Sequence, residues 1–146
     1  MKQMRRKGLV PLVAASMLWL PSVGCQREAS DAERIARMAM STASIWMMEH
    51  HEHEIIEGLE KGDLEEALHE TEELIGWMEG TPWLPELAGA AREATTAVRT
   101  VAVELNAGSR TGADAAIEIM KKKFHHVHHE LMETVAEQAE GEGNGD

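Results

Sequence analysis

Four segments of the chain repeat apolar residues every three or four positions, and residues that favour turns separate them. Gly62-Asp63 divides the first segment from the second, Gly80-Thr81-Pro82 the second from the third, and Asn106-Ala107-Gly108 the third from the fourth. This period matches the 3.6 residues of a helical turn, whereas a half-buried strand alternates with a period of two. No segment alternates in that way. The sequence therefore predicts an all-α protein with four helices.

Turn and capping residues set the expected ends of these helices. Ser30, Asp63 and Thr111 each precede an acidic residue by three positions, which resembles a helix N-terminus. Pro85 suits the first turn of the third helix. Because short connections make neighbouring helices antiparallel, we expect an up-down-up-down antiparallel four-helix bundle over residues 31–140. Residues 141–146 are rich in glycine and are expected to form a flexible tail.

Each helix carries one apolar stripe that is expected to face the core, and the alanines of the third helix are expected to allow close packing. On the first helix, Glu49 and His53 fall on the same face as the stripe, which predicts that they point inward. A buried carboxylate is costly unless it is paired or coordinated. The alternative is that the helix turns both groups to the edge of the bundle. The expected stripes are Ile35, Met38, Thr42, Ile45, Trp46 and Ile56; Leu64, Leu68, Thr71, Leu74, Ile75 and Met78; Leu87, Ala91, Ala94, Val98, Val101 and Leu105; and Ile117, Met120, Phe124, Val127, Leu131 and Val135.

The first 24 residues have the pattern of a secretory signal peptide. A basic stretch, Lys2 to Lys7, precedes twelve mostly apolar residues, 9–20, which are too few to cross a bilayer. Residues 20–25, Leu-Pro-Ser-Val-Gly-Cys, resemble the lipobox of bacterial lipoproteins, with Ser22 where a leucine is usual. The resemblance implies cleavage before Cys25, a lipid on Cys25, and a tether over residues 25–30. Alternatively, the same residues form an ordinary small-x-small cleavage site, which leaves Cys25 free.

The resemblance also implies a location. A lipidated Cys25 anchors the protein to a membrane from the periplasmic side, and Gln26 at the next position favours the outer membrane. Removing residues 1–24 takes away four of the 14 basic residues and none of the 26 acidic ones, so the net charge falls from −12 to −16. A surface this acidic argues against nucleic acid and suits cations, including metal ions.

The histidines are clustered. Seven of the eight lie within residues 50–53 and 125–129, and the eighth is His69. In an antiparallel bundle the two runs come to similar heights on the first and fourth helices, and His69 is expected level with Glu54. Imidazole suits Zn, Cu and Ni, and a thioether adds a preference for Cu(I). The alternative is a solvated histidine-rich face that binds metals adventitiously. The predicted metal ligands are Glu49, His50, His53, His125, His128 and Met132.

The run His125-His126-Val127-His128-His129 also resembles a haem motif. Class II cytochromes of the c-prime type are exported four-helix bundles whose last helix carries Cys-x-x-Cys-His. Here His125 and His128 stand where the cysteines would be, which excludes covalent haem, and His129 matches the haem-ligating histidine. The related periplasmic b-type cytochromes bind haem through a methionine on the first helix and a histidine on the last. That resemblance implies Met47 or Met48 with His125 or His129.

Three functions follow as hypotheses. The first is an exported lipoprotein that binds Cu, Zn or Ni between the first and fourth helices, for metal buffering, transfer or sensing. The second is a non-covalent haem b electron carrier. The third is a cofactor-free interaction protein of the cell envelope, with histidines that respond to pH. An enzyme is not expected, because no nucleophile–base arrangement or phosphate-binding loop is visible.

Overall fold

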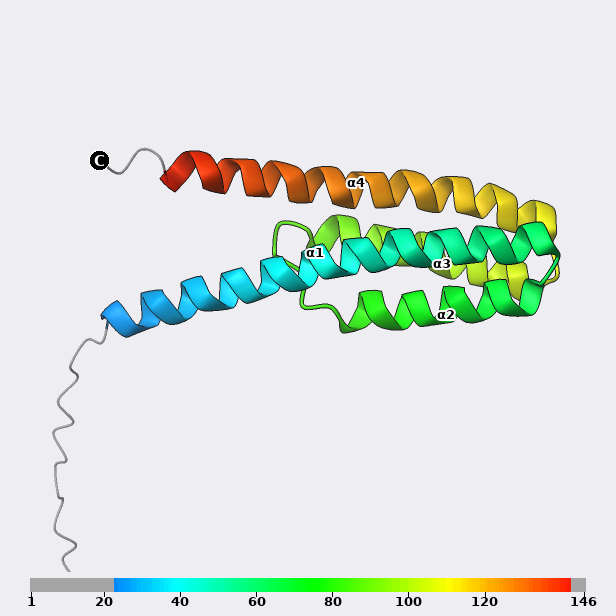
Figure 1. The fold of residues 1–146 in the computed structure, drawn as a ribbon, viewed down its shortest axis with the longest axis horizontal. Helices are drawn as coiled ribbons and strands as arrows, with labels where there is room; N and C mark the ends of the chain where they lie inside the picture. Colours follow the sequence, from blue (N-terminus) through cyan, green and yellow to red (C-terminus); the bar gives the residue numbers. More distant parts are fainter. Residues whose placement is uncertain (1–22, 143–146) are drawn as a thin grey trace, which may run out of the picture.

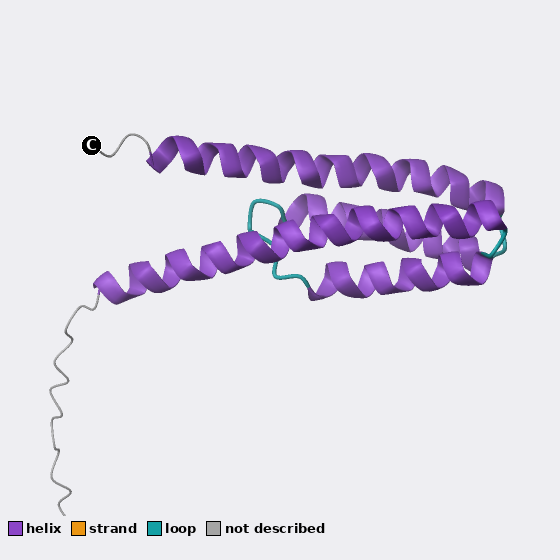
Figure 2. Ribbon diagram, viewed as in Figure 1, coloured by secondary structure: helices purple, strands orange, loops and turns teal. Residues whose placement is uncertain are grey.

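The chain folds into four helices, as Figures 1 and 2 show. The computed structural model describes residues 23–142, with the side chains of residues 30–140. Within that part there is no strand, which confirms the all-α four-helix prediction. The predicted signal peptide falls outside the described residues apart from Val23 and Gly24, and the predicted tail falls outside them after Glu142. The helices are α1 (Val23–Lys61), α2 (Leu64–Gly80), α3 (Ala88–Asn106) and α4 (Arg110–Glu142).

Consecutive helices run antiparallel and pack to different extents (Figure 1). The contact of α3 with α4 is the most extensive, and that of α1 with α4 is the least extensive. Ala91, Ala94 and Ala97 on α3 are buried, and their small side chains allow neighbouring helices to approach closely. The bundle is therefore tightest at α3–α4 and loosest along the line where α1 meets α4, which we call the α1–α4 seam.

The turns are built largely as the sequence suggests, with corrections at three helix starts. Pro85 lies in the turn before α3, which begins at Ala88, and not in the first turn of that helix. Asp63 caps α2, because its carboxylate accepts a hydrogen bond from the backbone N–H of Glu66 at 3.0 Å. The cap of α4 is Ser109, whose hydroxyl accepts from the N–H of Gly112 at 3.1 Å, so the helix starts before the predicted Thr111. The expected start of α1 at Ser30 is wrong, because the helix already runs from Val23 through the predicted tether. Good helix formers around that point let it continue.

The buried face of α1 differs from the predicted stripe. Residues at a spacing of seven, Ser41, Met48 and Ile55, lie at its centre and are fully or almost fully buried. Trp46, expected in the core, is 66% exposed, and Ile35 is 70% exposed. The prediction followed the large apolar side chains, whereas the true face contains small polar ones that let the neighbouring helices approach.

The stripes of the other helices are confirmed with one exception. All of the expected residues on α2 and α3 are buried or half-buried, and α4 buries Ile117, Met120, Phe124, Val127 and Leu131. Val135 is exposed instead, because the last turns of α4 extend past the ends of α2 and α3 (Figure 1). No helix in the described part of the chain combines the length and the apolar character that a membrane span requires.

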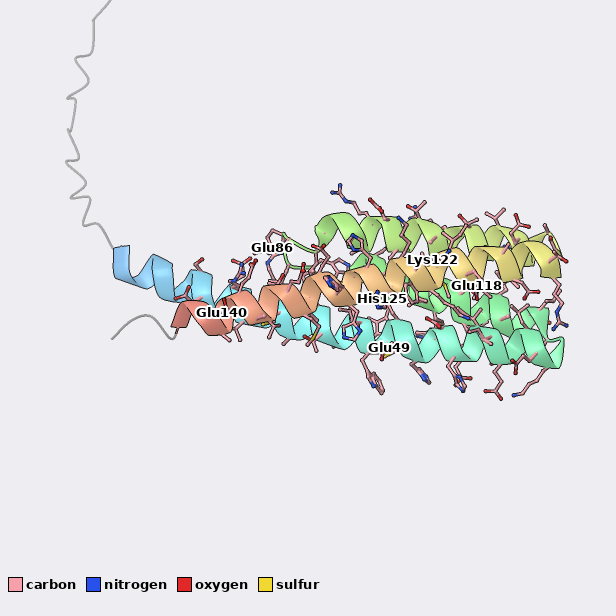
Figure 3. All side chains as sticks on the ribbon, turned by 90° about the horizontal axis from the view of Figure 1, so that it is seen from above. Glu49, Glu86, Glu118, Lys122, His125 and Glu140 are labelled. Atoms are coloured by element: carbon pink, nitrogen blue, oxygen red, sulfur yellow. The ribbon has the colours of Figure 1, made fainter. Side chains whose placement is uncertain are left out.

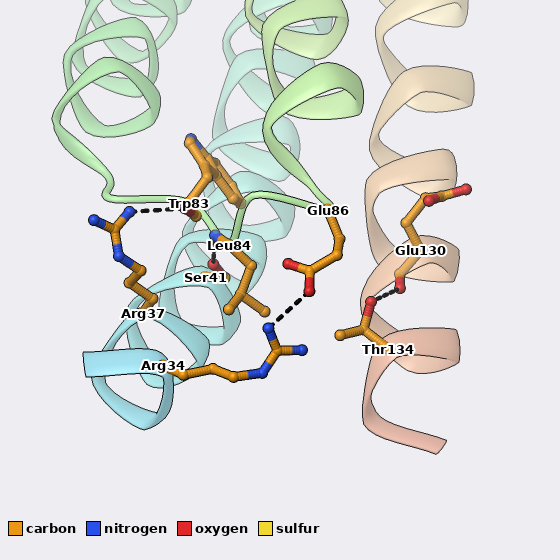
Figure 4. Close-up of polar contacts among 8 residues, drawn as sticks. All are labelled: Arg34, Arg37, Ser41, Trp83, Leu84, Glu86, Glu130 and Thr134. Carbon is orange, nitrogen blue, oxygen red and sulfur yellow. Dashed lines mark hydrogen bonds and ion pairs between the residues drawn. The ribbon is translucent and has the colours of Figure 1, made fainter. Parts of the chain in front are cut away.

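The connection between α2 and α3 is fixed against α1 (Figure 4). The buried Ser41 hydroxyl accepts a hydrogen bond from the backbone N–H of Leu84 at 3.2 Å, and the Arg37 guanidinium donates to the carbonyl of Trp83 at 3.4 Å. Arg34 pairs with Glu86 at 2.7 Å. These contacts explain why a serine occupies the core face of α1, since its hydroxyl satisfies a buried backbone N–H.

Gly58 allows α1 and α2 to touch, and this leads to a testable expectation. A Cβ at Gly58 would lie 3.0 Å from the backbone nitrogen of Ala67 and 3.2 Å from its Cβ, whereas nothing lies within 4 Å of a Cβ at Gly76. We expect Gly58→Val to lower the free energy of unfolding by about 1–3 kcal/mol more than Gly76→Val, because the added carbons overpack the contact. Urea denaturation measures both, and equal effects would contradict close packing at Gly58.

Candidate metal centre

His51 is a polar residue on the buried face of α1. It belongs to the series Ser44, His51 and Gly58, spaced by seven residues, which faces α2. Only 4% of His51 is exposed. Its Nδ1 lies 2.7 Å from Oε2 of Glu70 on α2, a carboxylate that is itself mostly buried. The close approach at Gly58 brings α2 near enough for this contact.

Glu73 completes a group of three possible metal ligands. Glu70 and Glu73 are three residues apart and therefore share one face of α2. His51, Glu70 and Glu73 each offer one ligand atom, and these atoms all lie within 4.8 Å of one another. One imidazole nitrogen and two carboxylate oxygens could hold a divalent metal ion.

The group opens into a surface cavity of about 520 Å³, which Met47, His50, Gly76 and Trp77 also line. The His50 ring lies 5.5 Å from that of His51 and stacks on Trp46 at 6.0 Å. A bound ion would thus be reachable from solvent, with an imidazole and a thioether nearby as further donors. A site with three protein ligands and an open position is typical of exchangeable or catalytic metals, whereas structural sites are closed.

Three of the six ligands predicted from sequence come together elsewhere, in the α1–α4 seam. Glu49 Oε1 lies 3.6 Å from His128 Nδ1. Both residues and His125 line a cavity of about 180 Å³, together with Ile45, Met48 and Phe124. Figure 3 shows Glu49 on α1 near His125 on α4.

The other predicted ligands lie apart from this seam. His50 belongs to the α1–α2 side. The inward orientation expected for Glu49 and His53 is wrong, because their side chains are 59% and 76% exposed. His53 lies 4.0 Å from Glu57 on its own helix. Met132 is 57% exposed near the end of α4 and does not line the seam cavity. The shifted buried face of α1 accounts for the difference at His53.

The remaining histidines lie on the surface, each within 4 Å of an acidic residue one turn further along its own helix. His69 lies 3.4 Å from Glu73, His126 lies 3.9 Å from Glu130, and the third contact, His129 with Glu133, measures 3.6 Å. Exposed pairs of this kind contribute little to stability.

The carboxyl group of Glu52, also in the seam region, has an altered ionisation. Partial burial raises the pKa of the Glu52 carboxyl; nearby Lys121 opposes the rise, and Glu49 and Glu118 add to it. Burial is the largest cause, so the raised pKa reflects the loss of hydration around this carboxyl group.

The seam does not form a ready haem pocket. Met48 and His125 line the cavity, but its volume of about 180 Å³ is below the roughly 300–1,000 Å³ typical of small-molecule pockets. His129, the residue matched to the haem-ligating histidine, is exposed and does not line it. Haem would require α1 and α4 to move apart.

Sequence reasoning missed the His51 group, although a signal was present. The expected register of α1 and α2 placed His69 level with Glu54, within about one turn of the observed pairing of His51 with Glu70. The residues that form the buried face of α1 were not predicted correctly, so His51 was not recognised as a buried ligand.

No protein-family model, no curated protein and no solved structure matches the chain.

Proposed function

We propose that this protein binds a divalent transition metal ion between α1 and α2, with His51, Glu70 and Glu73 as ligands. The observation that carries the proposal is the convergence of a buried imidazole with two carboxylates from the facing helix. Imidazole suits Zn, Cu and Ni, and the two oxygen donors favour Zn²⁺ over Cu(I), which prefers sulfur.

The surroundings support reversible binding. The cavity is open, and an ion there would be exchanged without unfolding the bundle. The chain carries a net charge of −12, so cations are attracted to its surface. Metal buffering, transfer or sensing fits a site of this kind better than a structural role does.

Calorimetric titration of the wild-type protein with Zn²⁺ tests the proposal. We expect a saturable site and a gain in stability of about 2.7 kcal/mol at a hundredfold excess over the dissociation constant. Affinity should fall as the pH is lowered, because protons compete with metal for imidazole. Absence of saturable binding, together with a Soret band in protein purified from its host, would instead favour the non-covalent haem carrier. Absence of both would favour a cofactor-free interaction protein.

We propose further that the protein is exported and lipidated on Cys25, which would place the metal site in the periplasm. The support is the signal-like first 24 residues and the single cysteine after Ser22-Val23-Gly24. Mass spectrometry of the mature N-terminus should show acyl chains on Cys25, and Cys25→Ala should move the protein from the membrane to the soluble fraction. An unmodified N-terminal Cys25 would contradict lipidation while leaving export intact.

A further inference from the structure

The α1–α4 seam contains carboxylate and imidazole side chains that do not belong to the His51 group. It lies on a different side of α1, against α4 instead of α2, where packing between helices is least extensive. Its cavity of about 180 Å³ is small, and Glu49, His125 and His128 supply its polar groups.

The register of the two helices adds a fourth residue. Glu49 meets His128 at 3.6 Å across the seam. In an antiparallel pair, one turn forward on α1 lies level with one turn back on α4, so Glu52 lies level with His125. Residues three apart share a helix face, so Glu52 lies beside Glu49 on the side of α1 that faces α4, although Glu52 does not itself line the cavity.

We propose that Glu49, Glu52, His125 and His128 form a second metal site, which binds a divalent ion such as Zn²⁺ and ties α1 to α4. Two nitrogen and two oxygen donors are a reasonable set for four-coordinate Zn²⁺. Glu49, His125 and His128 are exposed, so rotation of their side chains could bring them onto one ion.

The charge balance of the seam supports a cation there. Glu52 is half-buried, and among the described residues its carboxylate is assigned no hydrogen bond and no ion pair within 4 Å. The nearby Lys121 ammonium is bonded to Glu118 at 3.0 Å. A divalent ion would supply a positive charge next to the half-buried Glu52 carboxylate.

The site would have a mechanical effect that the first lacks. A metal at His51 joins α1 to α2, which already pack closely at Gly58. A metal in the seam joins the two neighbouring helices with the least extensive contact. Its binding should therefore reduce transient separation of α4 from α1. This second site is independent of the first and stands if the first fails.

The experiment is Zn²⁺ calorimetry in a His51→Ala background, with hydrogen exchange as a second readout. One site should remain, and Zn²⁺ should slow amide exchange around the seam in α1 and α4. Adding His128→Ala or Glu52→Gln should weaken this site at least about tenfold. Adding His126→Ala, which removes an outward-facing histidine of the same helix, should change nothing.

Each outcome decides between the possibilities. Loss of all saturable binding in His51→Ala would overturn the second site. Equal losses from His126→Ala and His128→Ala would overturn it in favour of an adventitious histidine-rich surface. A third result is that His51→Ala leaves binding unchanged, whereas His128→Ala, made alone, abolishes it. That result would support the seam site and contradict the His51 centre. Circular dichroism of each variant confirms that the helices persist.

Discussion

His51→Ala is expected to weaken the tightest metal site by about 100-fold or more, equivalent to about 2.7 kcal/mol. The substitution removes the only nitrogen donor of the group and leaves two carboxylates from one helix, which no longer bridge α1 to α2. Trp77 lines the same cavity, so quenching of its fluorescence by Cu²⁺ or Ni²⁺ should be lost in parallel with the calorimetric signal.

The control for His51→Ala is His53→Ala. His53 lies on the same helix but is 76% exposed, so its removal should leave the tight site unchanged. Without metal, His51→Ala should also cost about 1–3 kcal/mol of stability, because the mostly buried Glu70 carboxylate loses its hydrogen-bond partner. Equal losses of metal affinity in the two variants would show that the histidines act as an undifferentiated tract.

Phe124→Ala is expected to lower the free energy of unfolding by about 3–5 kcal/mol. Phe124 is 5% exposed and packs in the core on α4, where it also walls the seam cavity. Removing the ring deletes apolar contacts and enlarges the gap between α1 and α4, which few other contacts can close. Urea denaturation followed by circular dichroism gives the change.

Ile119→Ala provides the matched control on the same helix. Ile119 is 53% exposed, so its truncation should change stability by no more than about 0.5 kcal/mol. A loss for Phe124→Ala that is no larger than this would mean that α4 does not pack on the bundle through Phe124.

The sequence predicted the helices and three of the four buried faces because those faces are marked by large or regularly spaced apolar residues. On α3, for example, every expected core residue from Leu87 to Leu105 is buried. On α1 the same rule failed in part. Ile45 is buried and Met38 and Ile56 pack against the core, but Ile35, Thr42 and Trp46 are exposed, because the helix also contacts its neighbours through Ser41, Ser44 and Gly58. Small residues carry a weak hydrophobic signal, and their role depends on what approaches them in three dimensions.

Of the two candidate sites, the seam site was partly predicted from the sequence and the His51 centre was not. The sequence placed Glu49 and His128 in one predicted metal site, and they lie 3.6 Å apart. The His51 centre depended on which face of α1 is buried. Because each residue advances about 100° around the helix, His51 and His53 point to nearly opposite sides, and the predicted stripe includes His53 whereas the observed buried face includes His51.

The unbroken course of α1 makes the helix a spacer. With the lipid that we propose on Cys25, no flexible linker would separate the anchor from the bundle, because the helix already begins at Val23. His51 comes 26 residues after Cys25, a rise of about 40 Å along a straight helix. A helix perpendicular to the membrane would therefore hold the metal centre at a fixed distance from the bilayer. At that distance the centre could contact proteins that extend equally far from the membrane, but not the lipid headgroups.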